Sequence, residues 1–230
     1  MDMGTTKGIK VFAKRGAGYT FSMIEGDYWG VAYGISSGSP SVTSASFFEA
    51  TLSGGGMTMS GYRSDSSGSF LAPFSQSDAY TFNTAGGTFA MASQGADYAG
   101  MVGENGNVIL NVKKAAGDRE IVILIKKGSG LSFPSSNGVY ISGNFWKSTN
   151  FNSSFSFVDV KADGGMGNVN FNGDGTYEIQ SFDATLDPDG RMYITGDPNY
   201  YAAFDQSGTV GFSVGLETDD LEIDFIIRAQ

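Results

Sequence analysis

Short segments in which apolar and polar residues alternate recur along the chain. Phe155-Ser156-Phe157-Val158-Asp159-Val160 and Met192-Tyr193-Ile194 show this period of two, which is typical of strands with one buried face. Tight-turn sequences such as Asp187-Pro188-Asp189-Gly190 and Glu104-Asn105-Gly106 separate these segments. Since the period is two rather than 3.6, the pattern predicts an all-β protein whose antiparallel strands are joined by short connections.

The chain also contains an internal repeat. Gly26-Asp27-Tyr28 recurs as Gly138-Val139-Tyr140, and Arg119–Ile123 is matched by Leu221–Phe225. A fixed, long period of this kind indicates tandem modules. We therefore divide the chain into an N-terminal segment, 1–18, and two modules, 19–130 and 131–230.

The N-terminal segment resembles the end of a module. Gly8–Gly16 is similar to Glu120–Gly128, the predicted closing strand of the first module. Either the chain is a slice of a longer array, or each module takes its final strand from the preceding segment, as interlocking repeats do.

Each module contains about eight predicted strands in a meander, and the two edge strands of such a meander must be protected from pairing with other chains. Closure into a barrel removes both edges, and eight strands leave an interior that side chains fill or that holds one small ligand. We expect two tandem β-barrels. The alternatives are one continuous barrel or sheet, or a pair of sandwiches.

Composition narrows the possible functions. Apolar residues make up 40% of the chain, with 18 Phe and 11 Tyr, which is enough for a core. The net charge of -10 argues against a nucleic-acid partner, because phosphates require clustered Lys and Arg. The acidity belongs to the second module, where it favours solubility or attracts cations.

The chain has no Cys and no His. These absences exclude disulfides, thiol catalysis, the Ser-His-Asp triad, common zinc sites and histidine-ligated haem. No apolar run is long enough for a transmembrane helix. Low charge, abundant Ser, Gly and Asn, and β-repeats favour an extracytoplasmic protein, secreted or at the cell surface.

The start of each copy resembles a known group of proteins. Gly26-Asp27-Tyr28-Trp29 and Gly138-Val139-Tyr140 each place a Gly before an aromatic strand. This is similar to the calycin group of lipocalin-like and avidin-like barrels, whose first strand carries a Gly-x-Trp signature. The second copy has no Trp at that place, and no C-terminal helix follows either copy. The chain also looks like tandem β-repeats of bacterial surface proteins. The calycin resemblance implies a small apolar ligand inside each barrel.

Two aromatic stretches fall at places that we interpret as equivalent in the two copies. Aromatic side chains at a barrel mouth stack on a sugar or line an apolar pocket, whereas the plainer interpretation is core packing. The candidate ligand-binding residues are Tyr28, Trp29, Tyr33, Tyr140, Phe145 and Trp146.

Acidic residues gather in two further places. Asp187–Gly190 and Asn172–Gly175 are interpreted as hairpin turns, with a calcium site shared between loops as the alternative. On a strand, Asp220, Glu222 and Asp224 share one face, and we expect that face to be solvated while Leu221, Ile223 and Phe225 are buried.

Two hypotheses follow. The first is a non-enzymatic, extracytoplasmic tandem β-barrel protein that binds a small apolar or glycan-like ligand, without catalytic residues, metal or cofactor. The second is a structural or adhesive unit of a cell-surface array, in which strand pairing between modules or chains supplies the function and no small molecule binds.

Overall fold

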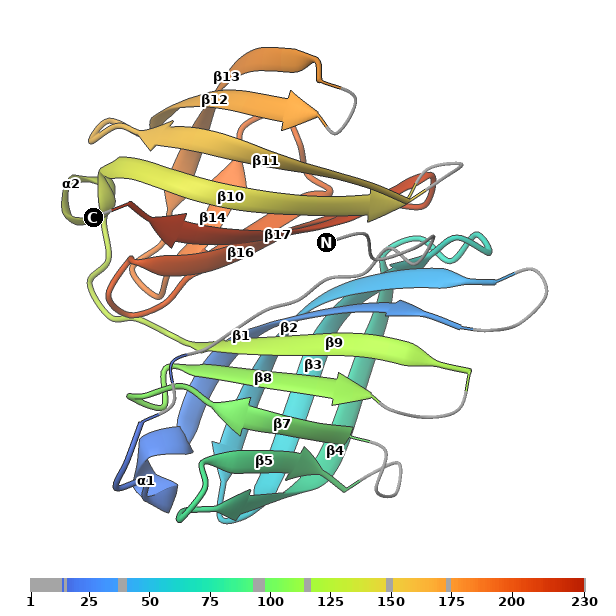
Figure 1. Cartoon of the computed structure of the whole chain (residues 1–230), viewed down its shortest axis with the longest axis vertical. Coiled ribbons are helices and arrows are strands. Elements are labelled where there is room, and N and C mark those ends of the chain that lie inside the picture. Colours follow the sequence, from blue (N-terminus) through green and yellow to red (C-terminus); the bar gives the residue numbers. More distant parts are fainter. Residues whose placement is uncertain are drawn as a thin grey trace.

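The computed structural model describes residues 14, 16–36, 41–92, 98–113, 117–147, 151–172 and 175–229. It is all-β and forms two closed antiparallel barrels in tandem, each with eight strands (Figure 1). The predicted fold class is confirmed, and the continuous sheet and the sandwich pair are excluded. Among the described residues the only helices are α1 (Phe21–Ile24) and α2 (Phe133–Ser136), and neither is long enough to cross a membrane.

The first barrel contains β1 (Gly26–Ile35), β2 (Thr43–Ser53), β3 (Gly56–Asp65), β4 (Ala72–Asn83), β5 (Thr88–Met91), β7 (Tyr98–Val102), β8 (Val108–Lys113) and β9 (Arg119–Lys126). The second contains β10 (Gly138–Lys147), β11 (Phe151–Val160), β12 (Gly165–Asn172), β13 (Tyr177–Leu186), β14 (Arg191–Ile194), β15 (Tyr200–Phe204), β16 (Val210–Glu217) and β17 (Asp220–Arg228). Consecutive strands are neighbours in both barrels, so each is a simple meander.

Each barrel closes with its own last strand. β9 pairs with β1, and β17 pairs with β10 in the same way. Of the two alternatives raised by the sequence, the one in which a module takes its final strand from the preceding segment is therefore wrong for both barrels. The predicted N-terminal strand falls almost entirely on residues outside those that the structure describes. In the described part, the barrels meet through side chains rather than through a shared ladder, because closure uses every strand edge.

A short helix covers one end of each barrel and is held there by a tyrosine of the first strand. The hydroxyl of Tyr28 in β1 donates to the carbonyls of Ile24 and Gly106, at 2.8 and 3.1 Å. The hydroxyl of Tyr140 in β10 donates to the carbonyls of Ser136 and Gly208, at 2.5 and 2.7 Å. Both rings are completely buried. The repeated Gly-x-Tyr sequence thus serves to close the barrel.

The two faces of β1 pack against different partners. Tyr28 and Ala32 point into the first barrel, whereas Trp29, Val31 and Tyr33 point outward and are equally buried. Together with outward residues of β2, β8 and β9, these three pack on outward residues of the second barrel, namely Ala203, Phe212, Val214, Leu216, Leu221 and Ile223. A shared apolar cluster therefore joins the barrels, which lie side by side in Figure 1.

The acidic turn Asp187–Gly190 completes this interface. The Asp189 carbonyl accepts hydrogen bonds from the Trp29 indole, at 3.0 Å, and from the Gly128 amide, at 3.1 Å. The Lys127 ammonium lies 3.8 Å from the centre of the Trp29 ring and forms a 2.7 Å ion pair with Glu49. The turn thus fixes the linker between the barrels.

We predict that Tyr140→Phe lowers the free energy of unfolding by about 1–3 kcal/mol, because the hydroxyl that donates to two buried carbonyls is lost. Chemical denaturation followed by circular dichroism measures the change. Tyr177→Phe is the control, since its side chain is 65% exposed, and it should change stability by less than about 0.5 kcal/mol. Equal effects of the two substitutions would contradict the role assigned to Tyr140.

Candidate functional site: the interior of the second barrel

The second barrel contains a cavity of about 1060 Å³. It extends from Met166 and Phe204, near α2, to Trp146 and the exposed Asp197 at the opposite end. The corresponding cavity in the first barrel measures only about 330 Å³. Cavities that bind small molecules commonly span about 300–1,000 Å³. The second barrel is therefore the larger candidate binding site.

Substitutions at corresponding interior positions explain the difference in volume. Gly30 pairs with Phe48 in the first barrel, and the corresponding pair in the second barrel is Ser142 with Ser156. A Cβ atom on Gly30 would lie 2.2 Å from the Phe48 ring, so the glycine makes room for the ring. With Ser at both positions, the second barrel has no ring to fill this part of its interior.

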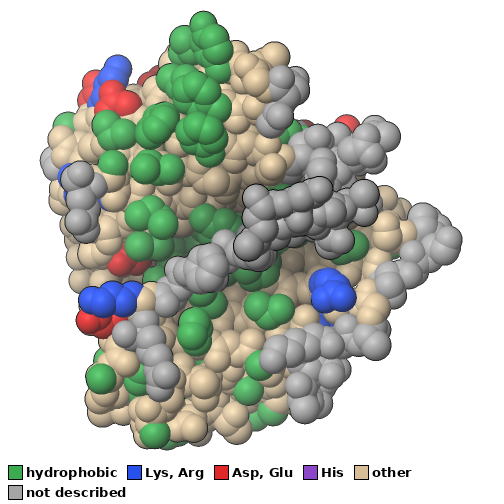
Figure 2. Space-filling view, in the orientation of Figure 1, with side chains coloured by type: hydrophobic (Ala, Val, Ile, Leu, Met, Phe, Trp, Pro, Cys, Tyr) green, Lys and Arg blue, Asp and Glu red, His purple; other side chains and the backbone are tan. Residues whose placement is uncertain are grey.

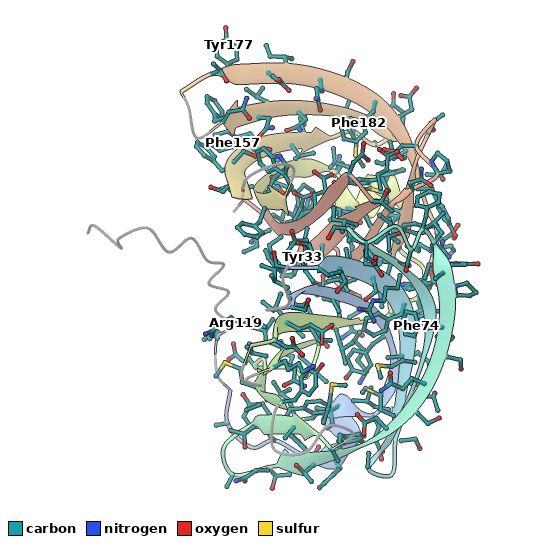
Figure 3. All side chains as sticks on the ribbon, turned by 90° about the vertical axis from the view of Figure 1, so that its right-hand side faces the viewer. Tyr33, Phe74, Arg119, Phe157, Tyr177 and Phe182 are labelled. Carbon is teal, nitrogen blue, oxygen red and sulfur yellow. The ribbon has the colours of Figure 1, made fainter. Side chains whose placement is uncertain are left out.

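Polar side chains surround the half of the cavity farther from α2. They alternate along their strands with outward apolar residues, as in Asn168-Val169-Asn170-Phe171-Asn172. The polar lining residues of β10 to β13 are Ser142, Asn144, Ser153, Ser154, Ser156, Asn168, Asn170, Asn172, Glu178 and Gln180. Near α2 the lining is apolar and includes Met166, Phe182 and Met192; Figure 3 labels Phe182.

A buried carboxylate stands on the opposite wall. One oxygen of Asp224 accepts hydrogen bonds from the hydroxyls of Tyr200 and Ser213, both at 2.6 Å. Burial raises the pKa of Asp224 to about 6, although the two hydroxyls oppose this shift. Burial and the nearby Asp224 also raise the pKa of Tyr200 well above its ordinary value, so this phenol stays protonated and donates.

The first barrel has a related pair. Tyr98 and Tyr200 occupy corresponding positions in β7 and β15. Tyr98 pairs with Lys113 of β8, and Tyr200 pairs with Gly215 at the corresponding position of β16. The Tyr98 hydroxyl donates to the carboxylate of Glu120, and burial is the main cause of the raised Tyr98 pKa. An interior tyrosine that donates to a carboxylate of the last strand is therefore common to both barrels.

The structure corrects the expected orientation of β17. Glu222 and Asp224 line the cavity, and Asp224 is only 2% exposed, whereas Leu221 and Ile223 point outward into the inter-barrel cluster. The alternation was predicted correctly, but Asp224 on the acidic face is buried inside the barrel rather than solvated. Periodicity reveals two faces without showing which one points inward, and here both are buried.

Of the predicted ligand-binding residues, only Trp146 lines the cavity. Tyr28 and Tyr140 hold the helices, and Trp29 packs between the barrels. Tyr33 and Phe145 meet edge to face at the same interface, with ring centres 5.7 Å apart.

The two Trp residues do not occupy equivalent positions. In the strand register, Trp29 corresponds to Ile141, and Trp146 corresponds to Gly34. Single-residue shifts move a side chain to the other face of a strand, so a likeness in residue type gave the wrong equivalence.

The cavity residues missed from the sequence are Asn144, Ser156, Asn168, Asn170, Tyr200 and Ser213. The available signal was the alternation of Asn and Ser with aromatic residues in 153–172. In a usual half-buried strand the apolar residues point inward. In this barrel the polar residues face inward at the open end.

No group of three or more Asp or Glu side chains within the described ranges is arranged to hold a metal ion. Residues 173–174 of the second acidic turn lie outside these ranges. Asp189 of the first turn instead has its carboxylate 4.0 Å from the Lys127 ammonium.

We predict that Asp224→Asn changes the pH dependence of stability. The pKa of Asp224 is raised in the folded state, so its ionisation makes the folded protein less stable as pH increases from about 4 to about 6. Relative to the Asn variant, the wild type should lose about 3 kcal/mol over this interval and change little above it. Denaturation at several pH values tests this; parallel curves for the two proteins would refute it.

Comparison with known proteins gives fold-level likenesses only. No family model matches the chain, and no curated protein does either. Transferrin-binding protein B from Neisseria meningitidis aligns at 10% identity with a TM-score of 0.31, covering 89% of this chain and 76% of that one. A protein provisionally assigned as AttH from Nitrosomonas europaea aligns at 9% identity with a TM-score of 0.30, covering 90% and 94%.

Kievitone hydratase from Nectria haematococca aligns at 7% identity with a TM-score of 0.26, covering 95% of this chain and 97% of that one. Because all three TM-scores are low, these likenesses carry no argument about function. The two eight-stranded meander barrels themselves fit the expected calycin-like architecture.

Proposed function

We propose that the second barrel binds a small, hydroxyl-rich ligand of glycan type in its interior, without catalysis. The observation that carries the proposal is the cavity of about 1060 Å³ with amide and hydroxyl groups around its open half. An apolar ligand would leave these groups without partners, which costs free energy for each buried polar atom. The polar lining therefore favours the glycan-like alternative over the apolar one.

Three buried atoms on this lining make no hydrogen bond to any residue that the structure describes. They are Ser154 Oγ, Asn168 Oδ1 and Asp224 Oδ1. Buried polar atoms in folded proteins nearly always have a partner. Hydroxyl groups of a ligand can donate to the two acceptors and accept from the serine, so a polyol matches these atoms chemically.

Trp146 contributes a flat apolar surface at the open end of the same cavity. Aromatic rings combine a large contact area with a defined orientation. A sugar ring that stacks on Trp146 would direct its hydroxyls toward the Asn and Ser residues. We assign Trp146 to ligand positioning, in keeping with the prediction from the sequence.

Asp224 acts as a fixed hydrogen-bonding group in this proposal, since Tyr200 and Ser213 already bind one of its oxygens. We also propose an extracytoplasmic location, supported by the low charge and the Ser-, Gly- and Asn-rich composition. The first barrel is assigned a supporting role, because Phe48 and Met59 fill much of its interior.

Fluorescence of Trp146 tests the proposal. The chain has two Trp residues, and Trp29→Phe leaves Trp146 as the only one. We expect saturable changes in its emission on titration with at least one of maltotriose, cellotriose and N,N′,N″-triacetylchitotriose. In the same background, Ser142→Gly combined with Ser156→Phe copies the Gly30 and Phe48 pair and should weaken binding at least tenfold.

Ser181→Ala, on the outward face of β13, is the matched control and should leave binding unchanged. The proposed ligand class is wrong if no saccharide binds, the apolar dye 1-anilinonaphthalene-8-sulfonate binds saturably, and the combined Ser142→Gly and Ser156→Phe substitutions abolish binding of the dye. If neither binds, the binding function itself is overturned.

A further inference from the structure

The outer surface of the second barrel carries two apolar rows that cross five neighbouring strands. Cross-strand pairing places the first row in the order Ile227, Ile141, Phe157, Val169, Ile179. The second row follows in the order Phe225, Gly143, Phe155, Phe171, Tyr177. We call these ten positions the aromatic face. None of them is charged.

The face is exposed and preorganised. Phe155, Phe157 and Tyr177 are 48%, 43% and 65% exposed, and Ile179 is 73% exposed. The rings of Phe155 and Phe171 stack with centres 4.9 Å apart, and Phe157 meets both edge to face. Figure 2 shows hydrophobic side chains gathered over the second barrel, and Figure 3 labels Phe157 and Tyr177. Contiguous apolar surfaces of this kind mark interaction sites.

The repeat shows what such a face does when it is covered. The corresponding rows of the first barrel begin with Ile125 and Trp29, and with Ile123, Val31 and Phe47. These five residues are buried against the second barrel. The same place on the scaffold is therefore a barrel-docking surface in the first copy.

The rows differ where the inter-barrel contact ends. In the first barrel, the row that begins with Ile125 and Trp29 continues with Glu49, Ser60 and Ser75, which are exposed. The corresponding residues of the second barrel are Phe157, Val169 and Ile179. This row of the first barrel thus becomes polar after its first two residues, whereas the corresponding row of the second barrel stays apolar across all five strands. The other row of the first barrel continues with Tyr62 and Pro73.

We propose that the aromatic face binds the same face of a second copy of this chain, forming a two-fold symmetric dimer through the second barrels. Phe225 belongs to the first position of its row and also packs against the inter-barrel cluster, so the face continues an interface already present. Six of the thirteen exposed large apolar side chains in the described part of the chain lie on it. The best-matched surface on a second copy is therefore the same face.

A membrane surface fits less well. The chain carries a net charge of -10, whereas attraction to anionic lipids requires clustered Lys or Arg beside the apolar surface. Association by strand pairing is also disfavoured, since both barrels are closed. The contact must come from side chains.

Sedimentation equilibrium of the whole chain tests the proposal. We expect a concentration-dependent dimer, and the double substitution Phe157→Glu and Ile179→Ser, which copies Glu49 and Ser75 of the first barrel, should raise the dimer dissociation constant at least tenfold. Met101→Ser is the control, because Met101 is 37% exposed on the first barrel and lies outside the face; it should leave the dimer unchanged. Unaltered circular dichroism shows that each variant is folded.

A cross-link distinguishes the two-fold arrangement from other contacts. Since the chain has no Cys, Val169→Cys introduces one thiol within the face. Under mild oxidation we expect a disulfide-linked dimer from this variant and little from Met101→Cys. A monomeric wild type, a dimer unaffected by the double substitution, or equal cross-linking of both variants would overturn the proposal. Monomers that co-sediment with phosphatidylcholine vesicles would assign the face to a membrane instead.

Discussion

Closure of each sheet on its own first strand is the constraint on which the rest of the structure depends. β1 is paired on both sides, by β2 and β9, and β10 is paired in the same way by β11 and β17. Closure gives every strand an inner and an outer face and leaves no edge to be protected. Inward-facing residues therefore determine whether a barrel is filled or hollow, and outward-facing residues determine what it packs against.

The two barrels use one scaffold for different purposes. In the first, the Phe48 ring occupies space made by Gly30, and a small cavity remains. In the second, Ser142 and Ser156 take these positions, and the interior is wide and polar at one end. The closing devices are kept in both, since Tyr28 and Tyr140 each hold a short helix over the end of the barrel. The two copies share the eight-stranded barrel and its closing contacts but differ in the side chains that line the interior.

The outer faces diverged in a parallel way. Trp29 and Phe47 of the first barrel are buried against the second, where the Arg191 guanidinium lies 5.5 Å and 5.3 Å from the centres of their rings. The corresponding Ile141 and Phe155 of the second barrel are 45% and 48% exposed. The outer surface that packs against a neighbouring barrel in the first copy is thus apolar but exposed in the second copy. The second barrel therefore combines a cavity suited to the binding hypothesis with an outer face suited to the structural hypothesis.

The sequence by itself determined the all-β class, the duplication and the strand alternation, because period-two patterns and turn residues are local properties of the chain. Of the aromatic residues that it placed at a barrel mouth, Trp146 lines the cavity, whereas Trp29, Tyr33 and Phe145 lie between the barrels. Only the tertiary structure decided which face of each strand points inward. When both faces of a strand are buried, as in β1 and β17, the alternating sequence pattern is the same whichever face points into the barrel. The contacts that settle it, such as Asp224 with Tyr200 or Trp29 with Asp189, join residues far apart in the chain or on different strands.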